Sequence, residues 1–373
     1  MRKALTISAT TLKMIIGMVF IFSAVLKFIT IDSFEIYLYS FGFFSLTLSY
    51  YAARLVIACE LLLGAALMSN RNSRFSILMT LLFLIVFIVF LAYAHIIGRT
   101  DSCHCFGDFL PLSPVQSILK NAVLVLLLIY VFKFYSRVWV PSWWQVILLY
   151  LVTAGGVLLY TVYAMRVLDY LSMVMILVMM VVGVVASFGF YRRWYVTTML
   201  VLTPFVTTFI LTPPDSWYYN GKETRFDKEL FLKQAGLFEG ETDVSVNDTA
   251  ANELAALHLE EGQHILAFFS PNCGYCRLCA GKLSAMAIRN GWPEGGLVYL
   301  FPRLDDEQKY NIFYEKAISA RFDESRIEKG LFLKITRGSF PLVLLVGEGE
   351  VKASYDYRNL DERELTDFLI KKQ

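Results

Sequence analysis

Two pairs of cysteines in this 373-residue chain are spaced for thiol–disulfide chemistry. The first pair is Cys273-Gly-Tyr-Cys276, which follows a short apolar run at 264–270 and opens a segment of helical pattern. A helix start stabilises negative charge through its unpaired backbone N–H groups and its dipole, so we expect a lowered pKa for the first thiol. A lower pKa supplies more attacking thiolate at neutral pH. We therefore predict that Cys273 attacks and Cys276 resolves.

The second pair, Cys103 and Cys105, is separated only by His104. Two cysteines with one residue between them can close only a strained ring, and strained disulfides are more readily reduced. This pair therefore suits transient exchange better than structural cross-linking, and His104 is placed to ease deprotonation.

A metal site is the alternative for the first motif, because Cys279 extends it to C-x-x-C-x-x-C. A ferredoxin-type run needs a fourth cysteine followed by proline, which is missing, and no histidine follows Cys276 as it does at haem attachment sites. We expect redox chemistry and no bound metal. Two roles stay open for Cys279, a packed helix residue or a second resolving thiol, and Cys59 is expected to be a buried small apolar residue.

The distribution of polar residues divides the chain into two parts, and their elements must position these cysteines. With 57% hydrophobic residues and a mean hydropathy of +0.54, the chain is too apolar for an ordinary soluble protein. Of its 32 acidic residues, those before residue 213 are Asp32, Glu35, Glu60, Asp101, Asp108 and Asp169. Seven stretches reach the roughly 20 apolar residues that a membrane crossing needs: 12–30, 51–69, 75–97, 115–134, 144–164, 168–190 and 195–212. A signal peptide is the alternative for the first stretch, but no small-residue cleavage site follows it, so we expect a helix.

The charges of the short loops set the expected orientation. With the N-terminus in the cytoplasm, the cytoplasmic ends carry basic and no acidic residues: Arg2, Lys3, Lys13, Arg71, Arg74, Lys133, Arg137, Arg192 and Arg193. The opposite ends carry Asp32, Glu35, Asp101, Asp108 and Asp169, with Lys27, Arg99 and Arg166 as exceptions. Seven crossings then place both cysteine pairs outside. In a bacterial cell this describes a multi-pass protein of the inner membrane whose C-terminal domain faces the periplasm, where disulfides are sustained.

Polar side chains inside the predicted membrane helices indicate a site in the outer half of the bilayer: Lys27, Arg54, Glu60, His95, Lys120 and Asn121. Ionisable groups are costly there and usually face a partner or a cavity, so Lys27 or Arg54 could neutralise Glu60. The alternative is that Lys27, Arg54 and Lys120 extend to the membrane interface. A quinone that exchanges electrons with the Cys103–Cys105 pair is a cofactor hypothesis, although the sequence holds no quinone motif.

Four segments follow from these patterns. Residues 1–135 form a four-helix unit with a long aromatic connection at 31–50, residues 136–212 add three helices, and 213–262 form a linker with one short helix around 250–259. In 263–373 we expect strands at 264–270, 296–301, 341–346 and 351–355, with helices at 273–290, 306–319 and 361–370. Strands that alternate with helices indicate an α/β domain.

The C-terminal segment resembles the thioredoxin superfamily over about 262–373. The similarity lies in the order strand, C-x-x-C, helix, strand and helix, then Pro341 ahead of a hairpin and a final helix. This resemblance implies that Pro341 occupies the family's cis-proline loop, which packs beside the disulfide and guides the substrate backbone. Asn272 and Tyr275 stand where that family commonly has Trp and Pro.

Residues of about 10–135 resemble the MauE/DoxX-type redox-associated membrane family, named for methylamine utilisation. The similar elements are Phe22-Ser23-Ala24-Val25-Leu26-Lys27, Glu60-Leu-Leu-Leu-Gly64, the Cys-x-Cys-Phe-Gly loop and Lys120-Asn121. His104 stands where that loop usually has Gly. The resemblance implies a role in forming or relaying disulfides for exported proteins.

Together these features predict a polytopic α-helical membrane protein with a C-terminal thioredoxin-like domain, acting as a thiol–disulfide oxidoreductase. Cys273–Cys276 would exchange with exported cysteine-containing proteins, and Cys103–Cys105 would exchange within the membrane module. The lipid bilayer is a partner, whereas a net charge of +2 without a basic tract indicates no nucleic acid. Two alternatives remain: a transporter or assembly and maturation factor whose thioredoxin-like domain binds a client, and a metal carrier that uses Cys273, Cys276 and Cys279.

Overall fold

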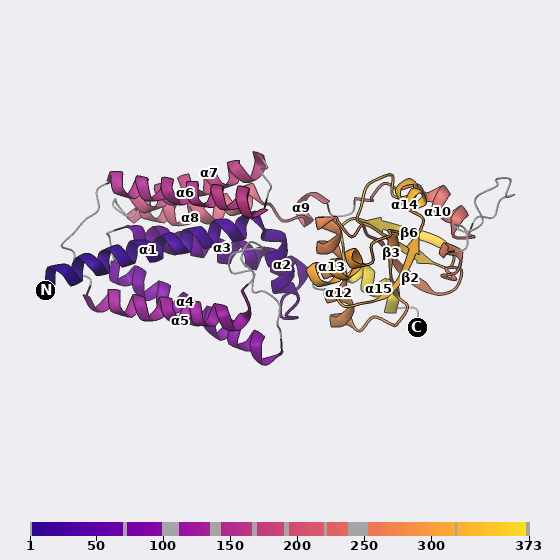
Figure 1. Cartoon of the computed structure of the whole chain (residues 1–373), viewed down its shortest axis with the longest axis horizontal. Helices are drawn as coiled ribbons and strands as arrows, with labels where there is room; N and C mark the ends of the chain where they lie inside the picture. The colour runs from indigo at the N-terminus through magenta and orange to yellow at the C-terminus, as the bar shows by residue number, and fades with distance from the viewer. Residues whose placement is uncertain are drawn as a thin grey trace. The chain divides into compact units, whose positions relative to one another are not determined.

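The chain divides into two compact units, which we describe separately. Our computed structural model describes residues 2–69, 73–98, 112–134, 143–165, 170–189, 194–219, 222–237, 253–317 and 319–370. One unit comprises Met1–Leu38 with Leu48–Pro213, and the other comprises Tyr39–Thr47 with Pro214–Gln373. Figure 1 shows long helices in the first unit and a sheet with surrounding helices in the second.

Long apolar helices build the first unit. They are α1 (Arg2–Ile29), α3 (Leu46–Met68), α4 (Ser73–Ile96), α5 (Pro114–Phe134), α6 (Trp143–Met165), α7 (Tyr170–Gly189) and α8 (Trp194–Leu211). Within the described residues, four segments are long and apolar enough to cross a membrane: Ala4–Ile29, Leu46–Met68, Arg74–Ile96 and Pro114–Phe134. Helices α6, α7 and α8 have 23, 20 and 18 residues, but their described side chains cover only apolar segments of up to 15 residues, so crossings five to seven stay predictions. The connection expected at 31–50 contains a helix of its own, α2 (Ile31–Tyr39).

Helices α1 and α3 approach each other at two glycines. A Cβ on Gly64 would lie 2.7 Å from Ile21 Cγ1 and 2.8 Å from the Gly17 carbonyl oxygen, so a larger residue cannot fit without movement. Such small residues allow close backbone approach between membrane helices. Nearer the N-terminus of α1, buried Lys13 donates to the Ser69 carbonyl at 3.0 Å. These contacts fix the register of the two antiparallel helices.

A mixed five-stranded sheet forms the centre of the second unit. Its strands are β2 (Gln263–Phe268), β3 (Leu297–Pro302), β4 (Asp323–Ile327), β5 (Leu342–Gly347) and β6 (Glu350–Tyr355), in the order β4-β3-β2-β5-β6. Strand β2 pairs in parallel with β3 and antiparallel with β5. Around the sheet lie α12 (Gly274–Asn290), α13 (Gln308–Ala317), α14 (Lys329–Ile335) and α15 (Glu362–Ile370). Every residue of β3 and of β5 is buried, which accounts for their continuous apolar sequences.

Part of the segment expected to be a linker belongs to this core. Residues 213–262 include α9 (Ser216–Tyr219) and α10 (Lys228–Gln234), and Asp227 caps α10 by accepting the Leu230 N–H. Phe231, Leu254 and Leu259 are buried in the same apolar cluster as strands β2 and β5. Because the segment is mostly polar, its sequence did not predict that these three side chains enter the core. A short helical turn occupies 253–255, and 250–252 lie outside the described residues.

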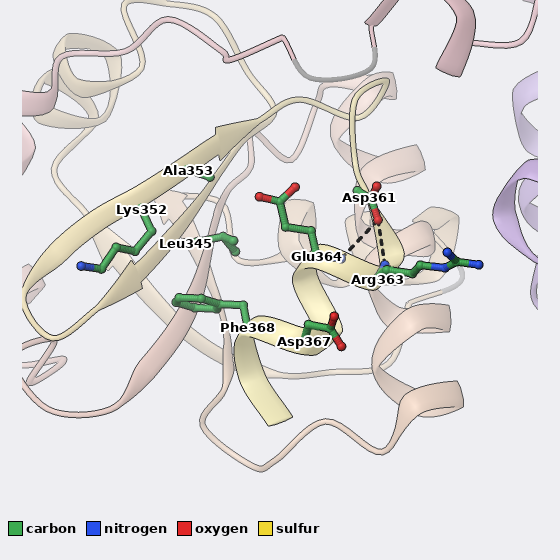
Figure 2. Close-up of a pocket in the computed structure, with 8 residues that line it drawn as sticks. All are labelled: Leu345, Lys352, Ala353, Asp361, Arg363, Glu364, Asp367 and Phe368. Carbon is green, nitrogen blue, oxygen red and sulfur yellow. Dashed lines mark hydrogen bonds between the residues drawn. The ribbon is translucent and has the colours of Figure 1, made fainter. Parts of the chain in front are cut away.

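Helix α15 packs across the hairpin of β5 and β6 and leaves a shallow hollow (Figure 2). The residues that line it are Leu345, Lys352, Ala353, Asp361, Arg363, Glu364, Asp367 and Phe368. Asp361 serves as a helix cap, since its Oδ1 accepts the backbone N–H of Arg363 at 2.8 Å and of Glu364 at 3.2 Å. The acidic character of the hollow thus reflects a helix start, and none of the predicted site residues lines it.

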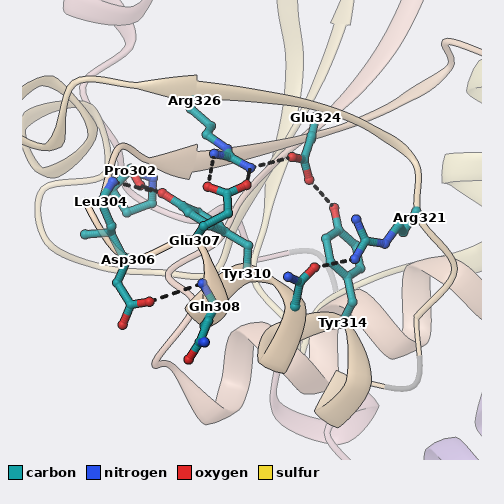
Figure 3. A network of polar contacts seen from close by, with 11 residues as sticks. Pro302, Leu304, Asp306, Glu307, Gln308, Tyr310, Tyr314, Arg321, Glu324 and Arg326 are labelled. Carbon is teal, nitrogen blue, oxygen red and sulfur yellow. Dashed lines mark hydrogen bonds and ion pairs between the residues drawn. The ribbon is translucent and has the colours of Figure 1, made fainter.

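Strand β4 and helix α14 were not expected from the sequence. Polar and charged side chains hold the edge strand β4 to α13 and to the residue before it (Figure 3). The strand therefore has no apolar pattern that sequence analysis could detect. The Arg326 guanidinium donates to both Glu307 carboxylate oxygens at 2.6 and 2.7 Å and to Glu324 at 3.0 Å. It also lies 4.1 Å from the centre of the Tyr310 ring. An exposed edge strand built this way shows little hydrophobic alternation.

Candidate active site

Cys273 is the N-cap residue of α12. Its backbone is extended, with φ −85° and ψ 122°, and its Sγ accepts the backbone N–H of Cys276 at 3.3 Å. The Cys273 N–H in turn donates to the Ser270 carbonyl at 3.0 Å, which closes the turn between β2 and the helix. A side chain that accepts from the first turn satisfies a backbone donor that would otherwise lack a partner. In this position the acceptor is a sulfur atom, which favours its thiolate form.

The thiols of α12 differ sharply in their acidity. The pKa of Cys273 is lowered to about 6, and the largest cause is a hydrogen bond from the Cys276 thiol. Partial burial opposes this shift. The backbone N–H groups of Cys276 and Tyr275 and the charge of Arg277 lower the pKa further. Burial raises the pKa of Cys276, and burial also raises that of Cys279. The arrangement therefore provides one accessible thiolate and one protonated partner thiol beside it.

The loop before β5 lies against the same cysteine. The Cys273 thiol lies 3.9 Å from the Phe340 carbonyl oxygen, and the Phe340–Pro341 peptide bond is cis. Pairing of Phe268 with Leu342 brings the end of β2 beside the start of β5, so this loop follows from the sheet register. Cys273, Cys276 and Pro341 are thus brought together. Cys279 is fully buried on the same helix, and the thiols of Cys273, Cys276 and Cys279 are free. Cys59 is also free, but it is half-buried and not buried as expected.

In the helical unit, Lys27 and Glu60 form a buried ion pair. The Lys27 ammonium donates to Glu60 Oε1 and, at 3.2 Å, to Ser23 Oγ, while Ser23 Oγ donates to Glu60 Oε2 at 3.2 Å. Lys27 is 1% exposed and its Nζ lies 5.8 Å from the Phe34 ring centre and 5.3 Å from that of Phe87. Lys27 therefore does not extend to the interface in this structure. Both oxygens of Glu60 are satisfied within the helix bundle.

Arg54, the other proposed counter-ion of Glu60, is bound elsewhere. Its Nη1 donates to Glu35 Oε1 at 2.5 Å and to the Tyr50 carbonyl at 2.7 Å, and its Nε donates to the Thr212 carbonyl at 2.5 Å. Only 3% of Arg54 is exposed, so this side chain is also held inside the unit. The partner role of Glu35 was missed, because Glu35 lies in the connection at 31–50 and not in a predicted membrane helix.

The remaining polar residues of the membrane helices fall into different environments. Lys120 lies close enough to interact electrostatically with both Lys27 and Glu60. Asn121 is buried, and its Nδ2 has no hydrogen-bond partner among the described residues. His95 is exposed in the last turn of α4 and is not drawn into this group. The structure thus gathers Lys27, Glu60 and Lys120 and separates Arg54 and His95 from them.

Cys103, His104 and Cys105 lie outside the described residues. Within the part of the chain that the structure describes, no group of three or more His, Cys, Asp or Glu side chains is arranged to hold a metal ion. The two units therefore combine a helical bundle with a buried ion pair and an α/β domain with a thiolate at a helix start.

Comparisons with known proteins find similarity for the helical part of the chain. Residues 5–134 match the family described as Methylamine utilisation protein MauE. Protein TlpB of Flavobacterium psychrophilum is 35% identical over 136 residues, which are 34% of this chain and 37% of that protein. The chain thus spans little more than a third of the length of the curated relative that it matches. No solved structure matches the chain.

Proposed function

We propose that this protein is a membrane-bound thiol–disulfide oxidoreductase with a thioredoxin-like C-terminal domain. The observation that carries the proposal is the position of Cys273. It caps a helix, accepts the Cys276 N–H at 3.3 Å and has a pKa lowered to about 6. The Pro341 loop beside it adds support, as does the mixed sheet from which α12 starts. A thiolate with a buried resolving thiol is the arrangement that disulfide exchange needs.

The exchange itself needs two thiols and one disulfide. The Cys273 thiolate attacks one sulfur of a substrate disulfide, which forms a mixed disulfide and releases the other sulfur as a thiolate. Cys276 then loses its proton and attacks the Cys273 sulfur, which closes the Cys273–Cys276 disulfide and releases the second substrate thiolate. Two electrons pass from the enzyme dithiol to the substrate, and the reverse sequence oxidises a substrate dithiol.

The Cys103–Cys105 pair is the proposed exchange partner of Cys273–Cys276. A membrane-soluble carrier of the quinone class is the proposed electron partner of the Cys103–Cys105 pair, and the polar group of Lys27, Glu60 and Lys120 would support this membrane module. The similarity to the MauE family over 5–134 supports a role in the membrane. Exported cysteine-containing proteins are the proposed substrates.

The proposed topology has seven crossings and a cytoplasmic N-terminus. It divides the chain into a MauE-like domain at 1–135, three further membrane helices at 136–212, a segment at 213–262 that contributes Phe231, Leu254 and Leu259 to the core of the C-terminal unit, and a thioredoxin-like domain at 263–373. Loop charges support this orientation, which puts the C-terminal domain in the bacterial periplasm. Modification of Cys103 and Cys273 in intact cells by a membrane-impermeant maleimide tests it. Protection of either one, with reaction after permeabilisation, would contradict the topology.

Trapping of mixed disulfides tests the exchange function. A Cys276→Ser protein cannot resolve the intermediate, so it should accumulate Cys273 joined to a substrate or to the membrane pair; Cys105→Ser should trap Cys103 in the same way. Non-reducing electrophoresis with mass spectrometry identifies the joined cysteines. Cys279→Ser is the matched control, because it removes a fully buried thiol of the same helix and leaves Cys276 in place to resolve the intermediate.

The outcome separates this function from its rivals. A client-binding factor would keep full function in a Cys273→Ser/Cys276→Ser double variant. A metal carrier would hold stoichiometric metal that competes with alkylation of Cys273, Cys276 and Cys279. Absence of trapped species, in proteins whose two pairs are shown to cycle between dithiol and disulfide, would exclude the relay.

A further inference from the structure

A stacked aromatic pair lies beside the reactive cysteine. Tyr275, which stands between the two cysteines, is 49% exposed, and its ring stacks on that of Tyr357 with centres 4.8 Å apart and planes at 20°. Offset stacking of this kind holds two rings in a defined geometry. Tyr275 and Tyr357 therefore form an aromatic surface that starts at the residue between the two cysteines.

An arginine completes this surface. The Arg358 guanidinium carbon lies 5.9 Å from the Tyr275 ring centre and 5.3 Å from that of Tyr357. Its Nε donates to the Tyr357 hydroxyl at 2.9 Å, and its Nη1 donates to the Tyr219 hydroxyl at 2.7 Å. We call Tyr275, Tyr357 and Arg358 the aromatic platform. These bonds fix the guanidinium before any substrate binds.

Buried Lys282 holds the platform from below. It donates to the Tyr357 carbonyl at 2.8 Å, and its Nζ lies 5.1 Å from the centre of the Tyr357 ring. Only 1% of Lys282 is exposed, and its charge also acts on the neighbouring thiol of Cys279. The Tyr357 ring is thereby constrained by Tyr275, Arg358 and Lys282, which makes the platform a preorganised surface.

A second arginine lies in the first turn of α12, the helix that follows Cys273. Arg277 interacts electrostatically with Cys273, and its Nη2 donates to the Asn272 carbonyl at 3.5 Å. Its buried Nε has no hydrogen-bond partner in the part of the chain that the structure describes. Of the acids near Arg358, Asp356 accepts the backbone N–H groups of Arg358 and Asn359, and Asp215 interacts with the guanidinium electrostatically. Two arginines therefore lie near the cysteine motif, Arg277 beside Cys273 and Arg358 against the ring of Tyr275.

We propose that the aromatic platform and Arg277 select substrates that carry a carboxylate side chain next to the reactive cysteine. The inference rests on the proposed exchange function and specifies its substrate class. Guanidinium groups pair with carboxylates through directed hydrogen bonds, and aromatic rings beside them supply apolar contact for the flanking backbone. Charges at the rim of an interface act chiefly on the association rate and on its salt dependence. A cysteine flanked by lysine meets the repulsion of both arginines.

Matched peptides test the selection. The full-length reduced protein in detergent is mixed with synthetic peptides whose single cysteine carries a thionitrobenzoate leaving group, and which differ only in an Asp or a Lys beside that cysteine. The Cys273 thiolate attacks the peptide sulfur, forms the mixed disulfide and releases the coloured thiolate. We expect the Asp peptide to react about ten-fold faster at low salt, within the range over which charge changes association rates. Added salt should reduce the ratio.

Variants locate the effect. Arg358→Gln and Arg277→Gln should each bring the Asp-to-Lys rate ratio toward one, and Arg358→Lys should keep part of it, because it retains charge without the planar fork. Arg321→Gln is the matched control, since Arg321 also lies over a tyrosine, 5.0 Å from the Tyr314 ring centre, away from the cysteines. Equal rates for the two peptides would overturn this inference alone. Reaction with neither peptide would overturn the proposed exchange function, and this inference with it.

Discussion

The Lys27–Glu60 pair and the Cys273 thiolate show two ways in which one chain stabilises a charge. Glu60 faces a full opposite charge and a hydroxyl, and both of its oxygens are bonded inside the helix bundle. Cys273 faces the thiol of Cys276, backbone N–H groups and one nearby arginine, and it stays partly exposed. A charge matched by a buried counter-ion is held in place, whereas a charge stabilised by donors at a helix start remains free to react. The first arrangement suits structure and the second suits chemistry.

Removing the counter-ion should give the largest effect on stability. Glu60→Ala leaves the Lys27 ammonium buried without its carboxylate, and breaking a buried pair in this way typically costs about 3–5 kcal/mol. We expect a large loss of folded protein in detergent, measured by thermal unfolding followed by size-exclusion chromatography.

A double variant sharpens this result. Lys27→Met/Glu60→Leu removes both charges at similar volume, so it should recover most of the stability lost in Glu60→Ala. Equal stability of Glu60→Ala and the unchanged protein would contradict the buried pair.

Crowding the contact between α1 and α3 should have the next largest effect. Gly64→Ala places a methyl group 2.7 Å from Ile21 Cγ1 and 2.8 Å from the Gly17 carbonyl, and overpacking of this kind costs about 1–3 kcal/mol. Gly155→Ala in α6 is the matched control, because nothing lies within 4 Å of its added Cβ. Thermal unfolding should show a loss for the first variant and none for the second. A loss of the same size in both would mean that the glycine contact is not the cause.

The pH dependence of alkylation tests the second arrangement, the thiolate of Cys273 at the helix start. Because the pKa of Cys273 is lowered to about 6, its reaction with iodoacetamide should reach half its maximal rate near pH 6 and not near the ordinary value of 9.0. Mass spectrometry of the reduced protein gives the rate for this residue. A midpoint above pH 8 would show that the helix start does not stabilise the thiolate.

The same shift has a consequence for stability. The pKa of Cys273 is lower in the folded chain than in the unfolded chain, so its thiolate stabilises the reduced fold fully at pH values above the unfolded pKa. This contribution is lost as the pH falls through about 6. The difference in unfolding temperature between the reduced protein and Cys273→Ser should therefore shrink from pH 8 to pH 5.

The exposed network of Figure 3 should give the smallest effect. Glu307→Gln weakens the bidentate pair with Arg326, but Glu307 faces solvent, where ion pairs contribute little. We expect an unfolding temperature within error of the unchanged protein and a smaller response than any variant above. A loss as large as that of Glu60→Ala would remove the distinction between buried and exposed charge pairs.

The sequence by itself determined the apolar helices and the position of Cys273. Apolar runs of membrane length predicted α1, α3, α4 and α5, because transfer free energy depends on each residue's own side chain. The C-x-x-C after a buried strand predicted a helix start, which the structure has at Gly274. Strands β2, β3 and β5 were predicted for the same reason, since their burial leaves continuous apolar sequences.

Only the tertiary structure decided which partners meet. It joined Lys27 to Glu60 and Arg54 to Glu35, and it brought Tyr357 and Arg358 to Tyr275 from more than eighty positions further along the chain. It also built β4 from polar residues. Such pairings depend on helix register, sheet order and close contacts such as Gly17 with Gly64, which no residue specifies alone. The type of a side chain determines which charges and hydrogen-bonding groups need a partner, and the packing of the fold determines which residue is that partner.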